Sequence, residues 1–313
     1  MPKILTVALG LLLALTACSP GTDASPQSTP TPSAGAASTD TSARELAVAE
    51  IRDTLPAQQP EKTVVMSVAL AEIIDSLGVV PDGVPTSQSP LPASLDQVPR
   101  VGSVIAPDVE MITGMQPDLI LGPTSIKDSL EKRFSPANLP TAYVPTDTLD
   151  DLIHTTLALG DLYGKTTEAE AVATEVDQAR ATASATKPVK VLILFGQSEE
   201  FNVLNERTFA GGIAADVGAT NVATELGLEE AYSPLSLEQV IIADPDLILF
   251  LAHGDLEAAE AGMAQITEGN DAWQKLRAVQ DGRVHALDHN AFFNASLLKA
   301  PAAYSEMASV LSQ

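Results

Sequence analysis

The sequence is short of cysteine, of basic residues and, beyond its first seventeen residues, of long apolar runs. A single cysteine, Cys18, stands among 313 residues, so a disulfide within the chain is impossible. Only 17 lysines and arginines accompany 41 aspartates and glutamates, a net charge of −24, which opposes binding to nucleic acid or to an anionic membrane surface. No later segment approaches the ~20 apolar residues that span a bilayer. These shortages exclude a nucleic-acid-binding protein and a multi-span membrane protein.

The beginning of the chain is typical of an export signal. Lys3 precedes an apolar run over 4–15, and small residues stand directly before Cys18, an arrangement that resembles the bacterial lipoprotein signal with its lipidated cysteine. We expect 1–17 to be a signal peptide and Cys18 to anchor the protein outside the cytoplasm on the cell membrane. The Ser-, Thr-, Pro-, Gly- and Ala-rich stretch 18–44 is expected to be a disordered linker. The alternative is an ordinary secretory signal with an incidental cysteine.

The remaining residues predict an α/β fold. Runs rich in Val, Ile and Leu alternate with helical patterns, and runs that are apolar on both faces indicate parallel strands covered on two sides. These runs are 64–66, 119–121, 142–144, 189–195, 247–251 and 284–287.

One unit of the sequence occurs twice. Glu110 stands seven residues before Pro117-Asp118 and an apolar strand, and Glu238 stands seven residues before Pro245-Asp246 and another. The repeat predicts two similar lobes, each with a central, mostly parallel sheet flanked by helices. The alternative is chance recurrence of a common helix-turn-strand pattern.

The two lobes are expected to flank one long helix. We place the N-terminal lobe at 45–165, the interlobe helix at 166–186, which lacks glycine and proline in its helical part, and the C-terminal lobe at 187–313. A stiff helix would permit limited hinge motion, and the ligand groove would lie between the lobes.

Residues that follow the predicted strands are candidates for ligand binding, because ligands of open α/β sheets bind beyond the carboxyl ends of the strands. Ser67 and Val68 follow the first strand and begin a helix, and Ser125, Ile126 and Lys127 follow the second, with Asp128 as a capping-box partner of Ser125. Free backbone N–H groups at such helix starts suit a carboxylate or phosphate. The alternative is that both serines only cap their helices.

Histidine supplies the candidate metal ligand. His253 follows the strand at 247–251 and precedes Gly254, a position from which an imidazole would project into the groove, and imidazole binds iron, including iron in haem. Taken alone, a histidine such as His253 is more often a hydrogen-bonded loop residue than a metal ligand. His154 and His285 are expected to be structural, and His289 to line the groove.

The order and spacing of these segments resemble the substrate-binding lipoproteins of iron-siderophore, cobalamin and haem ABC importers. Within them, the sequence looks most like the haem-binding lipoproteins of the iron-regulated surface determinant type. The similarity covers about 63–309. Its motifs are Ser67-Val68-Ala69-Leu70, Gly83-Val84-Pro85-Thr86-Ser87, Gly102 with Pro107 and Val109-Glu110, Ser125-Ile126-Lys127-Asp128, Lys190-Val191-Leu192-Ile193-Leu194 and His253-Gly254.

The resemblance implies a function in haem capture and delivery to an ABC permease for iron acquisition, with the chain acting as a monomer. His253 matches the family's iron-ligating histidine, and the haem propionates would face donors around Ser67, Val68, Thr86 and Ser87. The resemblance also implies that Glu110 and Glu238 are the surface glutamates that contact arginines of the permease.

The family's second axial ligand is a methionine, and the matching position here is Ile105, which cannot coordinate iron. Either His253 holds the iron alone, or another group substitutes, with Met66 as the first candidate. Met111 and Met115 are expected to be core residues. The same departure is also compatible with a ligand other than haem.

Two other interpretations compete with haem binding. The same scaffold would serve for a ferric siderophore or a corrinoid, although siderophores are usually held by arginines and tyrosines, and the chain is poor in both. An exported serine hydrolase is the distant alternative. The chain has no Gly-x-Ser-x-Gly elbow, and Gly196-Gln197-Ser198 is its closest approach, so we expect no enzyme and no catalytic cofactor.

Overall fold

The computed structural model describes residues 34–87, 89–197, 200–234, 236–251, 261, 263, 264, 267, 269–292 and 295–313. The chain forms two compact units, 1–40 and 41–313, and the sheets and pockets described below belong to the second. Within the described ranges, no helix has both the length and the apolar character needed to cross a membrane.

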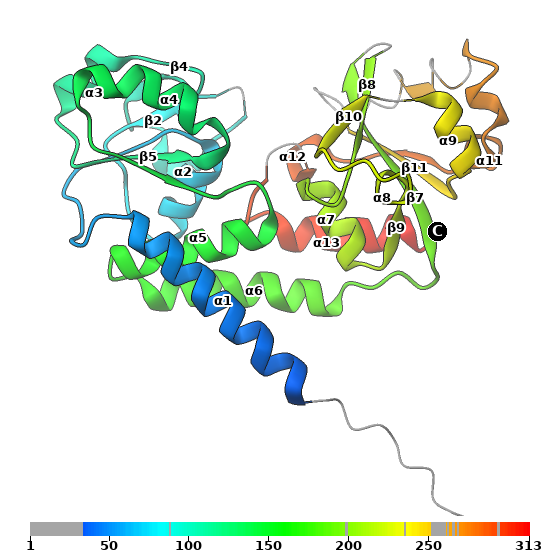
Figure 1. Ribbon diagram of the computed structural model, residues 1–313, viewed down its shortest axis with the longest axis horizontal. Helices are drawn as coiled ribbons and strands as arrows, with labels where there is room; N and C mark the ends of the chain where they lie inside the picture. The colour runs from blue at the N-terminus through cyan, green and yellow to red at the C-terminus, as the bar shows by residue number, and fades with distance from the viewer. Residues whose placement is uncertain are drawn as a thin grey trace, which may run out of the picture. The chain divides into compact units, whose positions relative to one another are not determined.

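The first half of unit 41–313 is built on parallel strands (Figure 1). The order is β1-β5-β6, and an isolated bridge from Val64 to Gly83 leads to a smaller sheet, β2-β3-β4. Every residue of β1 and β5 is buried, as expected for strands covered on both faces. The strands are β1 (Thr63–Val65), β2 (Val84–Thr86), β3 (Arg100–Ser103), β4 (Ala106–Pro107), β5 (Leu119–Pro123) and β6 (Thr141–Val144). The helices of this half are α2 (Val68–Ser76), η1 (Ala93–Leu95), α3 (Val109–Met115), η2 (Thr124–Ile126), α4 (Lys127–Phe134), η3 (Ser135–Ala137) and α5 (Leu149–Leu162).

The second half is built on a mixed sheet in the order β10-β8-β7-β11-β12, with β9 also pairing with β7. Strands β7, β9, β11 and β12 run parallel, whereas β8 and β10 are antiparallel additions at one edge. The strands are β7 (Val189–Gln197), β8 (Glu200–Leu204), β9 (Ala219–Asn221), β10 (Tyr232–Pro234), β11 (Leu247–Leu251) and β12 (Val284–Ala286). The described helices of this half are α7 (Phe209–Asp216), α8 (Val222–Glu225), α9 (Leu237–Ala243), η4 (Trp273–Lys275), α11 (Arg277–Gln280), α12 (His289–Phe292) and α13 (Ala300–Leu311). The predicted α/β class and mostly parallel sheets are confirmed.

The repeated unit has the same backbone geometry in both halves. Helix α3 ends at Gln116 (φ 53°) and helix α9 ends at Asp244 (φ 46°), both left-handed positions that stop an α-helix. Each helix is followed by the Pro-Asp pair and a fully buried strand. The recurrence in the sequence therefore reflects a recurring structural unit.

The aspartate of each Pro-Asp pair joins its strand to a neighbouring parallel strand, β5 to β1 and β11 to β7. A carboxylate oxygen of Asp118 accepts the backbone N–H of Lys62 at 3.0 Å, and one of Asp246 accepts that of Lys190 at 2.9 Å. The two lysine ammonium groups donate to backbone carbonyls at the ends of α3 (3.1 Å) and α9 (2.9 Å). Two acids and two lysines at equal sequence spacing thus hold equivalent corners of the two halves.

Helix α1 (Ala34–Thr54) corrects the expected extent of the linker. The composition of 18–44 predicts an irregular tether, but residues 34–44 are helical, because this stretch contains four alanines and no proline. Arg44 donates two hydrogen bonds to the carboxylate of Asp177 on α6 (Thr166–Thr182), at 2.6 and 2.9 Å. The helix predicted for 166–186 therefore occupies Thr166–Thr182 and is tied to the middle of α1 through Arg44.

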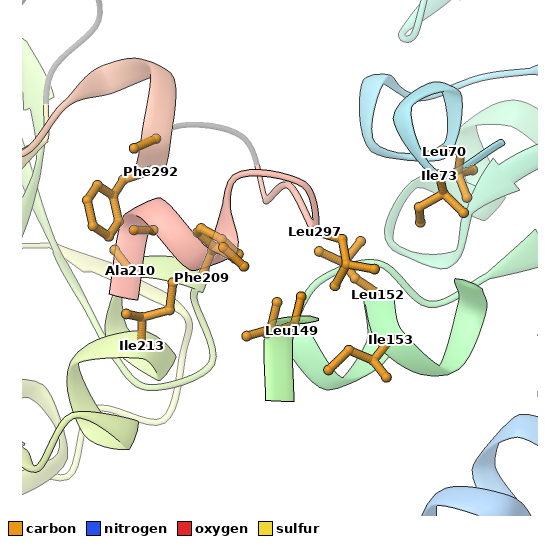
Figure 2. Packing of buried hydrophobic residues seen from close by; sticks show 14 of the residues in the cluster. Leu70, Ile73, Leu149, Leu152, Ile153, Phe209, Ala210, Ile213, Phe292 and Leu297 are labelled. Atoms are coloured by element: carbon orange, nitrogen blue, oxygen red, sulfur yellow. The ribbon is translucent and has the colours of Figure 1, made fainter. Parts of the chain in front are cut away.

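One hydrophobic core runs through both halves of the unit. It includes Leu70 and Leu152 from the first half and Phe209 and Phe292 from the second, and Leu297 packs in the same cluster. Figure 2 shows Leu297 beside Leu152, on the segment that leads into α13. Burying such a side chain contributes about 1.5–3 kcal/mol, so separating the halves would expose stabilising apolar surface.

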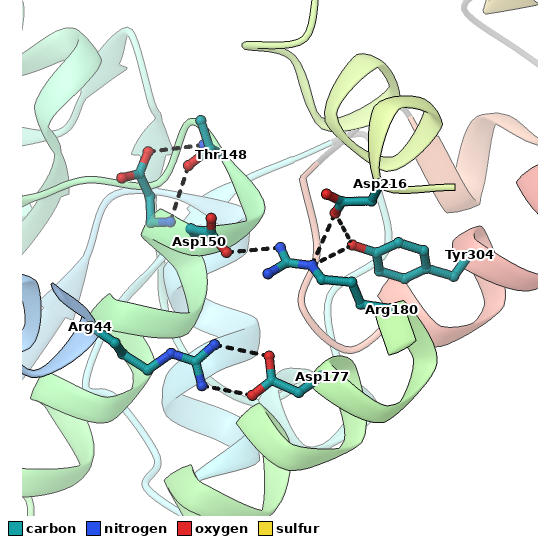
Figure 3. Close-up of polar contacts among 8 residues, drawn as sticks. Arg44, Thr148, Asp150, Asp177, Arg180, Asp216 and Tyr304 are labelled. Atoms are coloured by element: carbon teal, nitrogen blue, oxygen red, sulfur yellow. Dashed lines mark hydrogen bonds and ion pairs between the residues drawn. The ribbon is translucent and has the colours of Figure 1, made fainter. Parts of the chain in front are cut away.

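A polar network joins the helices around α6 (Figure 3). Arg180 pairs with Asp150 at the start of α5 (2.8 Å) and with Asp216 at the end of α7 (3.0 Å), and it donates to the Tyr304 hydroxyl on α13 (2.9 Å). Burial alone would lower the pKa of Arg180, but the hydrogen bonds to Tyr304 and Asp150 outweigh it and raise the pKa above its usual range. The guanidinium therefore stays charged and ties both halves to α6.

Candidate functional site

A pocket of about 610 Å³ lies at the carboxyl ends of parallel strands from both halves. Ser125 follows β5 and Asp147 follows β6, while Phe195 and Leu251 come from the ends of β7 and β11. This is the edge at which open α/β sheets bind ligands, and the volume is typical of small-molecule sites. Its full lining is Ser125, Thr146, Asp147, Thr148, Asp151, Phe195, Leu204, Arg207, Thr208, Phe209, Ala210, Ala231, Tyr232, Leu251, Phe292 and Ala295.

Aromatic side chains dominate the second-half wall of this pocket. Four of the chain's twelve Phe, Tyr and Trp residues line it: Phe195, Phe209, Tyr232 and Phe292. The rings of Phe195 and Tyr232 meet edge to face, with their centroids 6.0 Å apart. In a chain with only 4% aromatic residues, this concentration favours a flat or extended apolar ligand.

The charged lining residues are two acids and one base. Asp151 accepts the backbone N–H of Thr148 at 3.0 Å within the capping box of α5, so part of its hydrogen-bonding capacity is used. Asp147 is exposed. The pKa of Tyr232 is raised, mainly by partial burial of the phenol and secondarily by the negative charge of Asp147. The Tyr232 phenol is therefore protonated at neutral pH and available as a hydrogen-bond donor.

Arg207 is the one cationic side chain in the pocket lining, and it makes no ion pair with the described residues. Its guanidinium donates to the Glu229 carbonyl at 3.3 Å, and its backbone N–H donates to the Asn205 side chain at 2.8 Å. The remaining guanidinium donors face a pocket that otherwise carries acids. An anionic group on a ligand would pair with Arg207.

The segment that carries Arg207 is fixed by a buried turn. Asn205 is 4% exposed, and its amide donates to the carbonyls of Leu228 and Glu229, each at 3.1 Å. Thr208 caps α7 by accepting the N–H of Gly211 at 3.1 Å. This turn sets the direction in which Arg207 and the first turn of α7 face the pocket.

We expect Gly211→Ala to lower the free energy of unfolding by about 3 kcal/mol. A Cβ at Gly211 would lie 2.0 Å from the Asn205 carbonyl oxygen, so the backbone of the turn would have to move. The matched control is Gly212→Ala, whose Cβ would meet only the Glu206 oxygen at 3.3 Å, and we expect a change within about 1 kcal/mol. Denaturant unfolding of both variants checks this; equal stabilities would contradict the close packing at Gly211.

The predicted helix-start donors are only partly brought to the pocket. Ser67 caps α2, accepting the Leu70 N–H at 3.1 Å, and neither Ser67 nor Val68 lines the cavity. Thr86 and Ser87 are exposed and also lie outside its lining. The structure therefore places Ser67, Val68, Thr86 and Ser87 apart from the pocket.

Ser125 lines the pocket, but its predicted capping box with Asp128 is wrong. Ser125 lies inside the 3-10 turn η2, and α4 begins at Lys127 after Ile126, without a side-chain cap. A residue within a turn has helical backbone angles, so it cannot serve as the extended N-cap. Lys127 is instead a surface residue, 3.7 Å from Glu131 and 5.7 Å above the Tyr143 ring.

Met66 is not placed to bind iron at the pocket. Met66 has no exposed surface and packs in the cluster around Ile112, Ile120 and Phe134, so its sulfur is enclosed by the core of the first half. The expectation that Met66 could be a second ligand is therefore corrected. Ile105 is 70% exposed, between β3 and β4. Met115 packs against the core as expected, whereas Met111 is partly exposed.

Two of the predicted functional residues, Cys18 and His253, lie outside the described residues. His289 is the first residue of α12, which leads to the pocket residue Phe292, but the His289 side chain is also outside the described part of the chain. His154 is half-buried on α5, and burial lowers its pKa, in agreement with a structural role. His285 lies on β12, at a different cavity of about 450 Å³.

Glu110 and Glu238 are exposed on the equivalent helices α3 and α9. Neither has a hydrogen-bond or ion-pair partner among the described residues. Unpaired carboxylates at equivalent positions are available to basic groups of another molecule.

Sequence reasoning missed the aromatic wall and Arg207. The chain is poor in arginine and tyrosine, but one of each, Arg207 and Tyr232, lines the pocket. Arg207 comes shortly after β8 and Tyr232 begins β10, and both strands are antiparallel additions, whereas the prediction rested on the ends of parallel strands.

The fold also excludes the serine-hydrolase interpretation. The next element after β7 is the antiparallel strand β8, with Gln197 paired with Glu200. A nucleophile elbow needs a strand followed by a helix. Among the described residues, no group of three or more His, Cys, Asp or Glu side chains is arranged to hold a metal ion.

Two α/β halves with a pocket at their strand ends define a binding protein. The chain belongs to the periplasmic binding protein family, whose model matches residues 63–291. The family consists of substrate-binding proteins, in agreement with the expectation that the chain is not an enzyme.

Several known proteins are similar to the chain. The high-affinity heme uptake system protein IsdE of Staphylococcus aureus is 26% identical over 231 residues, covering 72% of this chain and 78% of IsdE. An ABC transporter substrate-binding protein from Listeria monocytogenes is 29% identical, with a TM-score of 0.72 over 81% of this chain and 98% of the other. The structure of S. aureus SirA with staphyloferrin B is 21% identical, with a TM-score of 0.66 over 82% and 94%, and shares the fold.

Proposed function

We propose that the chain is the substrate-binding component of an ABC importer for an iron complex, with haem as its ligand. The observation that carries the proposal is the pocket at the strand ends, lined by Phe195, Phe209, Tyr232 and Phe292. A planar apolar macrocycle buries a large area against such a wall, at about 25 cal/mol per Å². The heme uptake protein among the relatives and the S. aureus IsdE–heme structure, with a TM-score of 0.70, support the choice of ligand.

Within this proposal, His253 binds the iron from the second half, and it is the single protein ligand, because Met66 is enclosed and Ile105 cannot coordinate. A haem propionate pairs with Arg207 or with the Ser125 hydroxyl on the opposite wall. Ser67, Val68, Thr86, Ser87, Ile126, Lys127 and His289 remain proposed contacts. Those outside the present pocket lining would reach the ligand only after the halves close further.

The proposed setting is the outer face of the cell membrane, with Cys18 acylated and the linker holding the binding unit. Glu110 and Glu238 would contact arginines on the two sides of the permease. Their exposure on equivalent helices supports this role.

A ferric siderophore is the second candidate ligand. Arg207 and Tyr232 favour it, since a guanidinium and a phenol donor suit the anionic oxygen groups of such complexes. The similar fold of SirA, solved with staphyloferrin B, supports the same possibility at the level of the scaffold. A corrinoid remains a further candidate of the same class.

We expect His253→Ala to shift and weaken the Soret band that full-length protein in detergent shows on titration with haem. Loss of a nitrogen ligand changes the ligand field of the iron and removes one bond between the iron and the protein. His285→Gln, at the other cavity, is the matched control and should leave the spectrum unchanged. Titration with ferric carboxylate and catecholate siderophores runs in parallel; binding of one of these, with no Soret change from haem, would reassign the ligand.

A further inference from the structure

Helix α9 exposes two isoleucines beside Glu238. Ile242 is 77% exposed and Ile241 is 36% exposed, and they follow Glu238 by four and three residues. Side chains at these spacings share one face of a helix. An exposed carboxylate without a described partner therefore lies next to exposed apolar surface.

The equivalent helix of the first half exposes less apolar surface, with Met111 at 36% as its exposed large apolar side chain. The positions three and four residues after Glu110 are Thr113 and Gly114, both exposed. Both helices have the same length, the same left-handed end and the same lysine contact, as described above. The shared fold therefore accepts polar or small residues here, and packing within the chain does not explain the isoleucines.

We infer that Glu238, Ile241 and Ile242 form a single contact site for a transmembrane permease, whose surface offers an apolar hollow beside a basic residue. This rests on the proposed function and extends it. Glu238 would pair with the basic residue while the isoleucines fill the hollow, as apolar anchors do at protein interfaces.

Charge decides against the other occupants of this face. A net charge of −24 opposes adsorption of the chain to anionic lipid headgroups, so a bare membrane surface is a poor partner. A two-fold dimer built on this face would bring two Glu238 carboxylates and two chains of net charge −24 together, and like charges repel. A basic, apolar protein surface satisfies both parts of the site.

The two docking contacts should differ in character. The contact at Glu110 has only Met111 beside it and depends mainly on charge, and salt screens exposed charges. The contact at Glu238 adds apolar burial, which salt does not screen. At high salt, the second half should therefore stay bound to the permease, whereas binding of the first half should weaken.

The test compares the double variant, in which Ile241→Gln and Ile242→Gln are combined, with the single variant Leu46→Gln. Leu46 is 66% exposed on α1 and gives an equal change per residue on another helix. Haem-loaded protein with Cys18→Ser in every variant, which removes the proposed acylation site, is applied to nanodiscs that carry the ABC permease whose ATPase the wild type stimulates. We expect the double variant to raise the Kd at least roughly tenfold, more so at high salt, with haem affinity unchanged, and the control to match wild type.

Two outcomes would overturn the inference. The first is a double variant that binds the permease as tightly as Leu46→Gln does. The second is a loss that is equally large on nanodiscs without permease, which would make lipid the partner. The double variant Glu110→Ala/Glu238→Ala separates failure of this inference from failure of the proposed docking function. If that variant also binds normally, the docking role itself fails; if it binds weakly while the isoleucine variant binds normally, only the apolar contact fails.

Discussion

Ala231→Trp is expected to abolish binding of the iron complex, with affinity reduced at least roughly a hundredfold. Ala231 is half-buried and lines the pocket next to Tyr232, so an indole at this position would occupy the space in front of the aromatic wall. Isothermal titration with haem, and with ferric siderophores, measures the loss. The effect arises from filling the pocket and requires no change in the fold.

The control for this variant is Ala137→Trp, which places the same side chain at an exposed position on η3, outside the pocket. Ser125→Trp fills the pocket from the opposite half and tests the same space if Ala231→Trp is unstable. Thermal unfolding shows which variants are folded. Wild-type affinity in both folded pocket variants would show that the ligand binds elsewhere.

Glu110→Ala combined with Glu238→Ala is expected to abolish uptake and leave ligand affinity intact. Both carboxylates are exposed, lie outside the pocket lining and have no described partner, so their removal should disturb neither the fold nor the ligand. Loss of both would remove a charged contact from each half at once. Transport of haem into proteoliposomes that contain the permease measures the effect.

Glu170→Ala with Glu175→Ala is the matched control for the docking variant, since it removes two exposed carboxylates from α6 and changes the net charge equally. It should transport as wild type does. A docking variant with weakened haem affinity, or with normal uptake, would show that the two glutamates act in another way.

The sequence was sufficient to predict six apolar strands, β1, β5, β6, β7, β11 and β12, and the repeat, but not the remaining strands. Strands such as β5 and β11 are apolar at every position, a pattern that only a sheet covered on both faces accommodates. The recurrence of Glu110 and Glu238 before Pro-Asp pairs predicted equivalent units, and Gln116 and Asp244 end the helices in the same conformation. Local signals were enough because an apolar strand and a left-handed helix end are each encoded in a few consecutive residues.

The site itself was harder to predict, because its residues come from segments distant in sequence. Phe195, Phe209 and Phe292 would each be ordinary core residues on pattern alone, and only the packing of the two halves places them around one space. Met66 shows the reverse case: it ends a predicted strand near the groove, yet its side chain faces the core. Strand position does not determine which face of the sheet a side chain occupies.

Ser125 illustrates a second limit, which concerns backbone conformation. Ser and Asp three residues apart are typical of a capping box, but the 3-10 turn after Pro123 moves the helix start to Lys127. The same turn leaves the Ser125 side chain at the pocket. Helix starts are uncertain by one or two residues in a sequence, and that difference decides whether a serine caps or faces a ligand.

The pocket between the halves is proposed to hold one iron complex, and an absorption spectrum tests this proposal most directly. Full-length protein is purified from cells supplied with haem, and its Soret band and iron content are measured together. We expect one iron per chain and a Soret band, both absent from Ala231→Trp. Wild-type protein that carries neither haem nor any other iron complex, and that takes up none on titration, would contradict the claim.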